Sequence, residues 1–249
     1  DGMINLMQGD CLERMKEIES GSVDMILTDP PYGTTACKWD SIIPLEPMWE
    51  QLKRVIKPNG AVVLFGSEPF SSALRMSNIK GFKYDWVWDK VAGGNPFNNK
   101  IMPMKTTENI MIFEKKGGRV GYYPIMEDAN PDNIRPQNKK IQSSDLLGKF
   151  KNGFIPKSDP NKRFPKHLLK FNSRNGELNN VNRRHPTQKP LALMEYLILT
   201  YTNEGETVLD FTMGSGTTGV AAKNLNRSFI GIELDETYFN IAKDRINNS

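Results

Sequence analysis

Apolar residues follow two different spacings along the chain, and each spacing predicts one kind of element. Seven short runs of apolar and β-branched residues between turn-forming residues predict strands, at residues 4–7, 23–27, 61–65, 84–88, 109–113, 207–210 and 228–233. Apolar residues at helical spacing predict helices over residues 11–18, 45–56, 69–79, 190–201, 217–225 and 236–246. This alternation predicts an α/β fold with a Rossmann-like, doubly wound, mostly parallel sheet of seven strands.

A basic, irregular segment interrupts the alternation between residues 115 and 184. From Lys115 to Lys189 there are 17 Lys and Arg residues against 6 Asp and Glu, a net charge of +11. The whole chain of 249 residues has a net charge of only +4, so the remainder carries −7. Cations with interspersed aromatic rings favour a nucleic-acid surface, and a solvated insertion is the alternative. The predicted phosphate contacts are Lys139, Lys140, Lys162, Arg163, Arg174, Arg183 and Arg184.

The rest of the composition excludes several classes of protein. Apolar residues make up 38% and charged residues 25%, as in an ordinary globular chain. The chain has no apolar run near the roughly 20 residues that a membrane helix needs. Two cysteines and two histidines, scattered along the chain, predict neither a disulfide framework nor a metal site. We therefore expect a cytoplasmic protein that binds no metal and no membrane.

A glycine-rich loop follows the predicted strand at residues 207–210. It reads Gly214-Ser215-Gly216-Thr217-Thr218-Gly219, and the next strand ends in Glu233. Glycines let backbone N–H groups approach a ligand, and a carboxylate at that place can bind both hydroxyls of a ribose. Only 30 residues follow Gly219, too few for the other strands, so the N-terminal part must complete the sheet. The order of strands is therefore predicted to be circularly permuted.

The tetrapeptide Asp29-Pro30-Pro31-Tyr32 follows the predicted strand at residues 23–27. Ligands bind at the carboxyl ends of strands in open α/β sheets. The two prolines fix the backbone and remove two donors, which leaves nearby carbonyls free to accept hydrogen bonds. A carboxylate, a carbonyl and an aromatic ring held together can bind a planar group with an amino substituent. A rigid turn is the alternative for the tetrapeptide alone.

Together these motifs resemble the amino-methyltransferases that modify DNA bases with S-adenosylmethionine (SAM). The tetrapeptide, the late glycine loop, Gly9-Asp10-Cys11 and the hexapeptide from His185 to Pro190 carry the resemblance. Their order is similar to the β-class of that family. The resemblance implies a catalytic half at residues 1–114, a target-recognition segment at 115–184 and a cofactor-binding half at 185–249. It also implies double-stranded DNA as a partner. A homodimer and a cognate restriction endonuclease are the other partners to consider.

The resemblance further implies which residues bind SAM. Glu233 is expected at the ribose, Asp10 and Cys11 at the adenine ring, and Thr187 and Lys189 near the methionine end. The predicted cofactor-binding set is Asp10, Cys11, Asp29, Thr187, Lys189, Asp210, Phe211, Gly214, Ser215, Gly216 and Glu233. One departure from the family concerns Phe211, which stands one place earlier than the usual loop phenylalanine. Asp210 is expected either to contact the cofactor or to cap the loop.

The predicted catalytic residues are Asp29, Pro30, Pro31 and Tyr32. Hydrogen bonds from an exocyclic amine to the Asp29 carboxylate and the Pro30 carbonyl would direct its lone pair at the SAM methyl group. Tyr32 would stack on the base after it leaves the duplex. Within the family, Asp at the head of the motif favours N6 of adenine. The alternatives are N4 of cytosine, RNA, a catalytically silent partner subunit, and a dinucleotide oxidoreductase, which the chain order disfavours.

Overall fold

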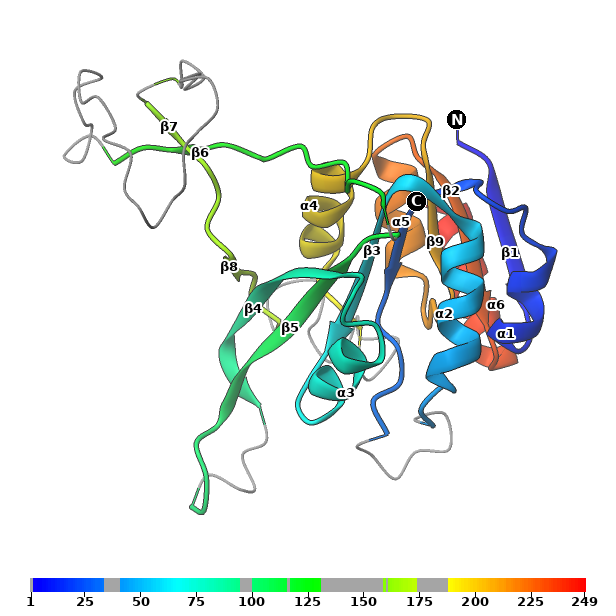
Figure 1. Cartoon of the computed structure of the whole chain (residues 1–249), viewed down its shortest axis with the longest axis horizontal. Coiled ribbons are helices and arrows are strands. Elements are labelled where there is room, and N and C mark those ends of the chain that lie inside the picture. Colours follow the sequence, from blue (N-terminus) through cyan, green and yellow to red (C-terminus); the bar gives the residue numbers. More distant parts are fainter. Residues whose placement is uncertain are drawn as a thin grey trace. The chain divides into compact units, whose positions relative to one another are not determined.

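A computed structural model of the chain describes residues 2–33, 41–94, 100–115, 117–130, 159, 161–173 and 188–249. Two compact units are present, one made of Asp1–Tyr123 with His167–Ser249 and the other of Pro124–Lys166. The first unit contains a sheet with helices on both faces (Figure 1). The second unit contains the antiparallel strands β6 (Glu127–Asp128) and β7 (Lys162–Arg163).

Eight strands form the sheet of the first unit, in the order β1-β10-β9-β2-β3-β5-β4-β8. Their bounds are Ile4–Gln8 for β1, Val23–Thr28 for β2, Ile56–Gly66 for β3, Phe82–Gly94 for β4, Lys105–Phe113 for β5, Leu168–Lys170 for β8, Thr207–Asp210 for β9 and Ser228–Glu233 for β10. Most neighbours pair in parallel, and β5 runs antiparallel to both β3 and β4. The sheet is therefore mixed and mostly parallel, as expected.

The permuted strand order is confirmed. Strand β9 pairs with β2 on one side and with β10 on the other, and β10 pairs with β1. The chain leaves β2 toward β3 and leaves β9 toward β10, so it departs in opposite directions from these two adjacent strands. This is the topological switch point at which open α/β sheets bind ligands.

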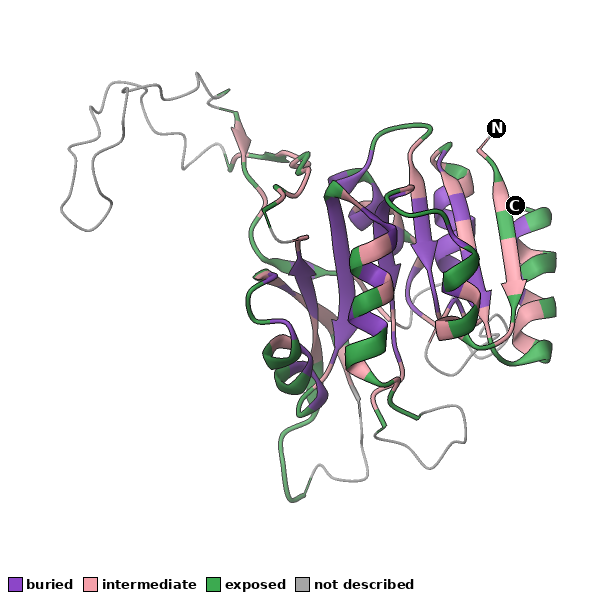
Figure 2. Cartoon of the chain, turned by 45° about the vertical axis from the view of Figure 1, so that its right-hand side comes forward, coloured by how far each residue is buried: buried purple, intermediate pink, exposed green. Residues whose placement is uncertain are grey.

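Helices cover the two faces of the sheet and bury two separate cores. One face carries α4 (Leu191–Tyr201), α5 (Thr217–Asn224) and α6 (Glu236–Asn247), and the other carries α1 (Cys11–Arg14), the 3₁₀-helix η1 (Met15–Glu17), α2 (Leu45–Val55) and α3 (Phe70–Ser77). Successive residues of a strand point to opposite faces. Accordingly Val63 packs in the first core and Val62 and Leu64 in the second. Figure 2 shows the buried strands between helices that are exposed on their outer sides.

Three details differ from the sequence-based expectations. The sheet has eight strands among the described residues instead of seven, because β8 forms inside the segment that was expected to be irregular. The predicted helix over residues 11–18 is a short α-helix followed by a 3₁₀ turn. Helix α2 ends at Val55, before the Pro-Asn-Gly sequence, because Ile56 is already extended and buried as the first residue of β3.

Candidate active site at the carboxyl edge of the sheet

Asp29 lies directly after β2, at the topological switch point. All six residues of β2 are buried, so the strand is fixed in the core and the chain emerges at its carboxyl end. The neighbouring strand β9 ends in Asp210 and leads into the glycine loop. The hydroxyl of Thr212 donates to the backbone carbonyl of Asp29 over 3.1 Å. The predicted catalytic tetrapeptide and the predicted cofactor loop therefore meet at one place.

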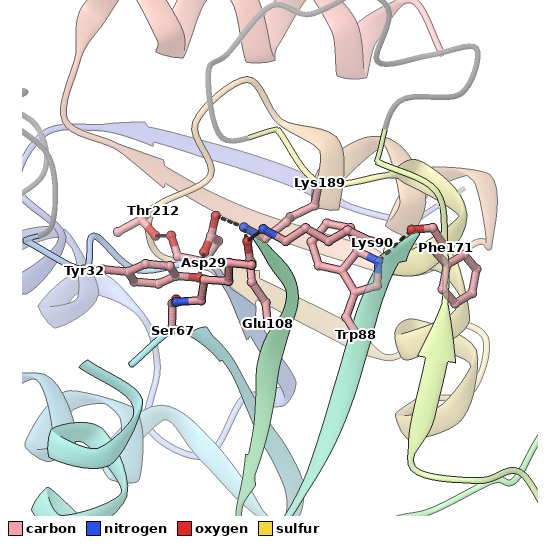
Figure 3. Close-up of polar contacts among 10 residues, drawn as sticks. Asp29, Tyr32, Ser67, Trp88, Lys90, Glu108, Phe171, Lys189 and Thr212 are labelled. Atoms are coloured by element: carbon pink, nitrogen blue, oxygen red, sulfur yellow. Dashed lines mark hydrogen bonds and ion pairs between the residues drawn. The ribbon is translucent and has the colours of Figure 1, made fainter. Parts of the chain in front are cut away.

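Two side chains hold the Asp29 carboxylate. The ammonium of Lys189 donates to Oδ2 over 2.5 Å, and the hydroxyl of Tyr32 donates to Oδ1 over 2.6 Å (Figure 3). A carboxylate has about four acceptor positions, so each oxygen keeps one for a further donor. Within the described residues, no donor of the chain approaches the carbonyl of Pro30. The arrangement therefore fixes the Asp29 anion with acceptor positions left over, which suit a ligand that has N–H groups.

Lys189 is buried between two carboxylates, although it stands just before α4 and a lysine in such a place is usually exposed. Its side chain is 8% exposed, and its Nζ lies 3.2 Å from Oε2 of Glu108 in addition to its bond to Asp29. Glu108 also forms an ion pair with Lys90. Two carboxylates and two ammonium groups thus alternate in one largely buried row, visible in Figure 3.

The charges in this row influence each other's ionisation. Burial would lower the pKa of the Lys189 ammonium, but Asp29 and Glu108 outweigh burial and raise it. Burial would raise the pKa of the Glu108 carboxyl, but Lys189 and Lys90 hold it below its ordinary value. For Asp29, burial raises the pKa, Lys189 opposes that shift and Glu108 adds to it. The ionised form of Asp29 therefore depends on Lys189.

Aromatic rings surround this part of the site. The Tyr32 ring stacks on Phe70 with 5.3 Å between centroids. Nζ of Lys189 lies 5.0 Å from the centroid of Phe65, 5.9 Å from that of Trp88 and 6.0 Å from that of Tyr32. Rings favour a nearby cation through their quadrupole, which partly replaces the water that the buried ammonium has lost. Tyr32 lies at the edge of this group with its hydroxyl toward Asp29.

The glycine loop is tied to the end of β10. The backbone N–H of Gly214 donates to Oε2 of Glu233 over 2.8 Å, and the N–H of Asp235 donates to Oε1. Gly216 has a φ of 81°, and a Cβ built there would lie 2.8 Å from Cβ of Ala242. Only glycine fits this turn at the start of α5. The side chain of Ser215 is buried and receives a hydrogen bond from the guanidinium of Arg245.

Asp210 and Phe211 serve the loop and the core. Oδ1 of Asp210 accepts from the hydroxyl of Thr28, and Oδ2 accepts from that of Thr218. Burial raises the pKa of the Asp210 carboxyl to about 7. Oδ1 of Asp210 also accepts from the N–H of Thr212, which caps the start of the loop, and a contact with the cofactor stays a prediction. Phe211 is 1% exposed and packs in the core between the sheet and α2, a place that offers no ring surface to a ligand.

Asp10 and Cys11 lie at the carboxyl end of β1, next to Glu233. The N–H of Gly9 donates to the carbonyl of Glu233 over 2.9 Å. Oδ1 of Asp10 caps α1 by accepting from the N–H groups of Leu12 and Glu13. Burial and the nearby Asp10 raise the pKa of the Cys11 thiol to about 12, which leaves it protonated and a poor nucleophile at neutral pH.

Several predicted residues lie outside the part of the chain that the structure describes. These are Thr187 of the cofactor set and Lys139, Lys140, Arg174, Arg183 and Arg184 of the basic set. Lys162 and Arg163 are described and lie on β7, where Nζ of Lys162 pairs with Asp128 over 2.6 Å. That pair is exposed, and such pairs contribute little, so it leaves the lysine able to exchange partners.

Glu108, Lys90 and Thr212 belong to the site and were not predicted. The sequence contains a signal for Glu108, because it is a charged residue directly before the apolar run at residues 109–113. In the structure its side chain is 12% exposed. Thr212 and Lys90 had no such signal, because polar residues in a loop or at a strand end are common. Within the described ranges, no group of three His, Cys, Asp or Glu residues could hold a metal ion. Among those same residues, no helix has the length and apolar character needed to cross a bilayer.

Comparison with known proteins gives a consistent match. The family model described as "DNA methylase", of the N6/N4 type, matches residues 23–244. The type II methyltransferase M2.DpnII of Streptococcus pneumoniae is 30% identical over 97% of this chain and 88% of its own length. The type II methyltransferase M.HpaI of Haemophilus parainfluenzae is 29% identical over 98% of this chain and 74% of its own length.

Solved structures agree in fold. The crystal structure of the M1.HpyAVI–SAM complex is 30% identical and matches with a TM-score of 0.63 over 98% of this chain and all of that one. The cytosine-N4-specific PvuII DNA methyltransferase is 19% identical, with a TM-score of 0.66 over 98% of this chain and 86% of its own, and shows the fold alone. With the family model covering most of the sequence and relatives aligned along nearly its whole length, the chain belongs to the N6/N4 family of SAM-dependent DNA methyltransferases.

Proposed function

We propose that this enzyme transfers a methyl group from SAM to the exocyclic N6 of an adenine that has been flipped out of duplex DNA. The observation that carries the proposal is the fixed Asp29 carboxylate beside the available Pro30 carbonyl, at the switch point where the glycine loop begins. An amine with two N–H groups is the ligand that this pair of acceptors suits.

The residues present fit SAM as the cofactor. Glu233 and Asp10 lie at the carboxyl ends of the adjacent strands β10 and β1, and both accept hydrogen bonds from backbone N–H groups of nearby turns. Their remaining acceptor positions suit the hydroxyls and amino group of an adenosine. The tight turn at Gly216 lets the backbone of the loop approach a ligand closely. When bound, SAM supplies an electrophilic methyl group on a sulfonium.

The chain's own residues activate the amine. The lone pair of an exocyclic amine is delocalised into the base, so the amine is a poor nucleophile. Hydrogen bonds to Asp29 and to the Pro30 carbonyl favour a more pyramidal nitrogen and stabilise the positive charge that grows on it. Lys189 and Tyr32 keep Asp29 anionic and oriented before the base arrives, so the carboxylate needs no reorganisation. The Asp29 carboxylate is also the acceptor for the proton that the methylated amine releases.

The choice of adenine rests on Asp29 at the head of the tetrapeptide. Digestion of DNA methylated by the enzyme, followed by nucleoside analysis, tests it directly. N6-methyladenine is expected, and N4-methylcytosine without N6-methyladenine would reject the adenine target. Asp29→Asn keeps the shape of the side chain and removes its charge, so it should abolish transfer. The same Asp29→Asn variant should still show the rise in melting temperature that SAM produces by binding the folded state.

Target recognition is proposed for residues 115–184. Its support is the net charge of +11 between Lys115 and Lys189 and the presence of a separate compact unit, Pro124–Lys166, within it. Each phosphate contact releases counterions, so affinity for DNA should fall steeply with salt. Replacing Lys162 and Arg163 by Gln should reduce that slope. An affinity that hardly changes between low and moderate salt would contradict phosphate contacts by this segment.

The relatives are named type II methyltransferases of bacteria, which supports a bacterial or phage enzyme that acts in the cytoplasm beside a cognate restriction endonuclease. Methylation by the enzyme should then protect its recognition site from that endonuclease, and unprotected sites would argue for a solitary role. A homodimer is the second partner in the proposal. Light scattering on the purified chain, with and without DNA, measures the molar mass. A mass of one chain, 28.2 kDa, would contradict the dimer, and twice that mass would support it.

A further inference from the structure

The carboxylate of Glu108 lies close enough to that of Asp29 to influence its ionisation, and none of the catalytic roles proposed above uses it. Glu108 lies on β5, and its Cα partner on β4 is Trp88, so it comes from a part of the sheet that belongs to neither motif. Its side chain is 12% exposed, and a buried carboxylate is costly unless it is paired. Another anion near Asp29 would also hinder the ionisation of Asp29 if no cation lay between them.

Lys189 is that cation, and its geometry is defined by both anions. Its Nζ lies 2.5 Å from Oδ2 of Asp29 and 3.2 Å from Oε2 of Glu108. A lysine ammonium on a flexible four-carbon stem with a single anionic partner can take several positions around either oxygen of that partner. A second anion on its other side restricts the ammonium to the line between the two carboxylates. Lys90 in turn neutralises Glu108 from the far side.

We propose that Glu108 is a positioning residue for methyl transfer, which shares the Lys189 ammonium with Asp29, keeps it in one place between the two carboxylates, and thereby sets the orientation and acceptor strength of the catalytic carboxylate. This inference rests on the proposed function of Asp29. Glu108 touches neither the base nor the cofactor in this role. It acts only through Lys189, and Tyr32 holds the opposite oxygen of Asp29.

The sign of the electrostatic effect follows from the row of charges. Glu108 raises the pKa of Asp29, and Lys189 lowers it. In Glu108→Gln the ammonium has Asp29 as its only anionic partner, so Asp29 becomes a weaker acceptor with a lower pKa. In Lys90→Gln the Glu108 carboxylate loses one cation and draws Lys189 toward itself, so the pKa of Asp29 rises. The two variants therefore shift Asp29 in opposite directions.

Other titrating groups face Asp29 and must be distinguished from it. Tyr32 donates to Oδ1, and Asp210 lies close enough for the two carboxylates to influence each other. The pKa of Asp210, raised to about 7 by burial, lies within the working range of an assay at neutral pH. Asp210 is present in the wild type and in both variants, so only the difference between their pH profiles reports on the row that contains Glu108.

The experiment measures kcat and KM for methyl transfer to DNA as a function of pH. Glu108→Gln should lower kcat by about 10- to 100-fold, because a small misplacement of a reacting group can cost up to about 100-fold in rate. The KM values for SAM and DNA should change by less than about threefold, since no substrate contact is removed. The acidic limb of the kcat profile should move to lower pH in Glu108→Gln and to higher pH in Lys90→Gln.

A merely structural role predicts something else. The melting temperatures of both variants would then fall, while the acidic limbs of their kcat profiles would stay where they are in the wild type. That result would overturn the proposal. A Glu108→Gln enzyme whose kcat is unchanged, or in which KM alone changes, would also overturn the proposal. If Glu108→Gln does not fold, the Lys90→Gln variant tests the proposal instead, because the Lys90 side chain is more exposed than that of Glu108. An acidic limb of the kcat profile that does not move in Lys90→Gln would then overturn the proposal. A wild-type enzyme that binds SAM but methylates no DNA would instead overturn the proposed function.

Discussion

Removal of the Lys189 charge is predicted to destabilise the fold much more than removal of an ordinary surface lysine. In Lys189→Met the carboxylate of Asp29 stays buried without its cation, and Glu108 keeps only Lys90. At an effective dielectric constant of about 20, Coulomb's law gives about 7 kcal/mol for a separation of 2.5 Å and about 5 kcal/mol for 3.2 Å. The net loss is smaller, because burying the ammonium itself costs free energy, and about 3–5 kcal/mol is expected.

Urea unfolding of the wild type, Lys189→Met and Lys16→Met measures this loss. Lys16 is the matched control because its Nζ lies 2.8 Å from Glu13, while both side chains are more than half exposed. Its replacement should cost less than about 1 kcal/mol. Similar free energies of unfolding for the two variants, within about 1 kcal/mol, would refute the argument that burial decides the strength of the pair.

The pH dependence of the loss gives a second check. Without Lys189 the pKa of Asp29 is raised further above its unfolded value, because burial is no longer opposed. A carboxyl with a raised pKa in the folded state binds more protons folded than unfolded, so its contribution to stability disappears as pH rises. The deficit of Lys189→Met should therefore grow from acidic to neutral pH, and a deficit that shrinks would contradict this sign.

Three further predictions concern other residues. The pKa of about 7 for Asp210 implies that wild-type stability falls between about pH 4 and about pH 7, and Asp210→Asn should remove that slope in urea titrations at several pH values. Gly216→Ala should lower stability more than Gly205→Ala, by roughly 1–3 kcal/mol, because both have positive φ but only a Cβ at 216 meets Ala242; equal losses would exclude the clash. Cys11, with a pKa raised to about 12, should react with iodoacetamide at mildly alkaline pH far more slowly than a free thiol, and peptide mass spectrometry would reveal rapid labelling if this is wrong.

Local patterns in the sequence predicted most of the sheet correctly. The runs at 207–210 and 228–233 coincide with β9 and β10, since buried parallel strands are short and continuously apolar. The permutation could also be predicted, because 30 residues after Gly219 are too few to complete a sheet. Strand β8 could not, because it has three residues and only Leu169 is buried. Its pairing with β4 depends on contacts that are distant in sequence.

The site was only partly predictable for the same physical reason. Asp29, Glu233 and the glycines stand in motifs whose local geometry dictates their use. Lys189 is separated from Asp29 by 160 positions and stands before a helix, where a lysine is usually exposed. Its burial follows from the convergence of β2, β5 and the start of α4 in space. Phe211 shows the reverse case, since its motif suggests a ligand contact while its side chain is part of the core, and its place in the cofactor-binding set stays a prediction.

Hydrogen bonds between β2 and β9 explain how two distant motifs become one site. The hydroxyl of Thr28 donates to Asp210 over 2.9 Å and accepts from the N–H of Phe211 over 3.1 Å, while Thr212 donates to the carbonyl of Asp29. These bonds join residues that are more than 180 positions apart in sequence, yet they lie on or next to adjacent strands of one sheet. None of them involves the basic segment at 115–184. Asp29 is therefore held in place by bonds between adjacent core strands and the loops that follow them.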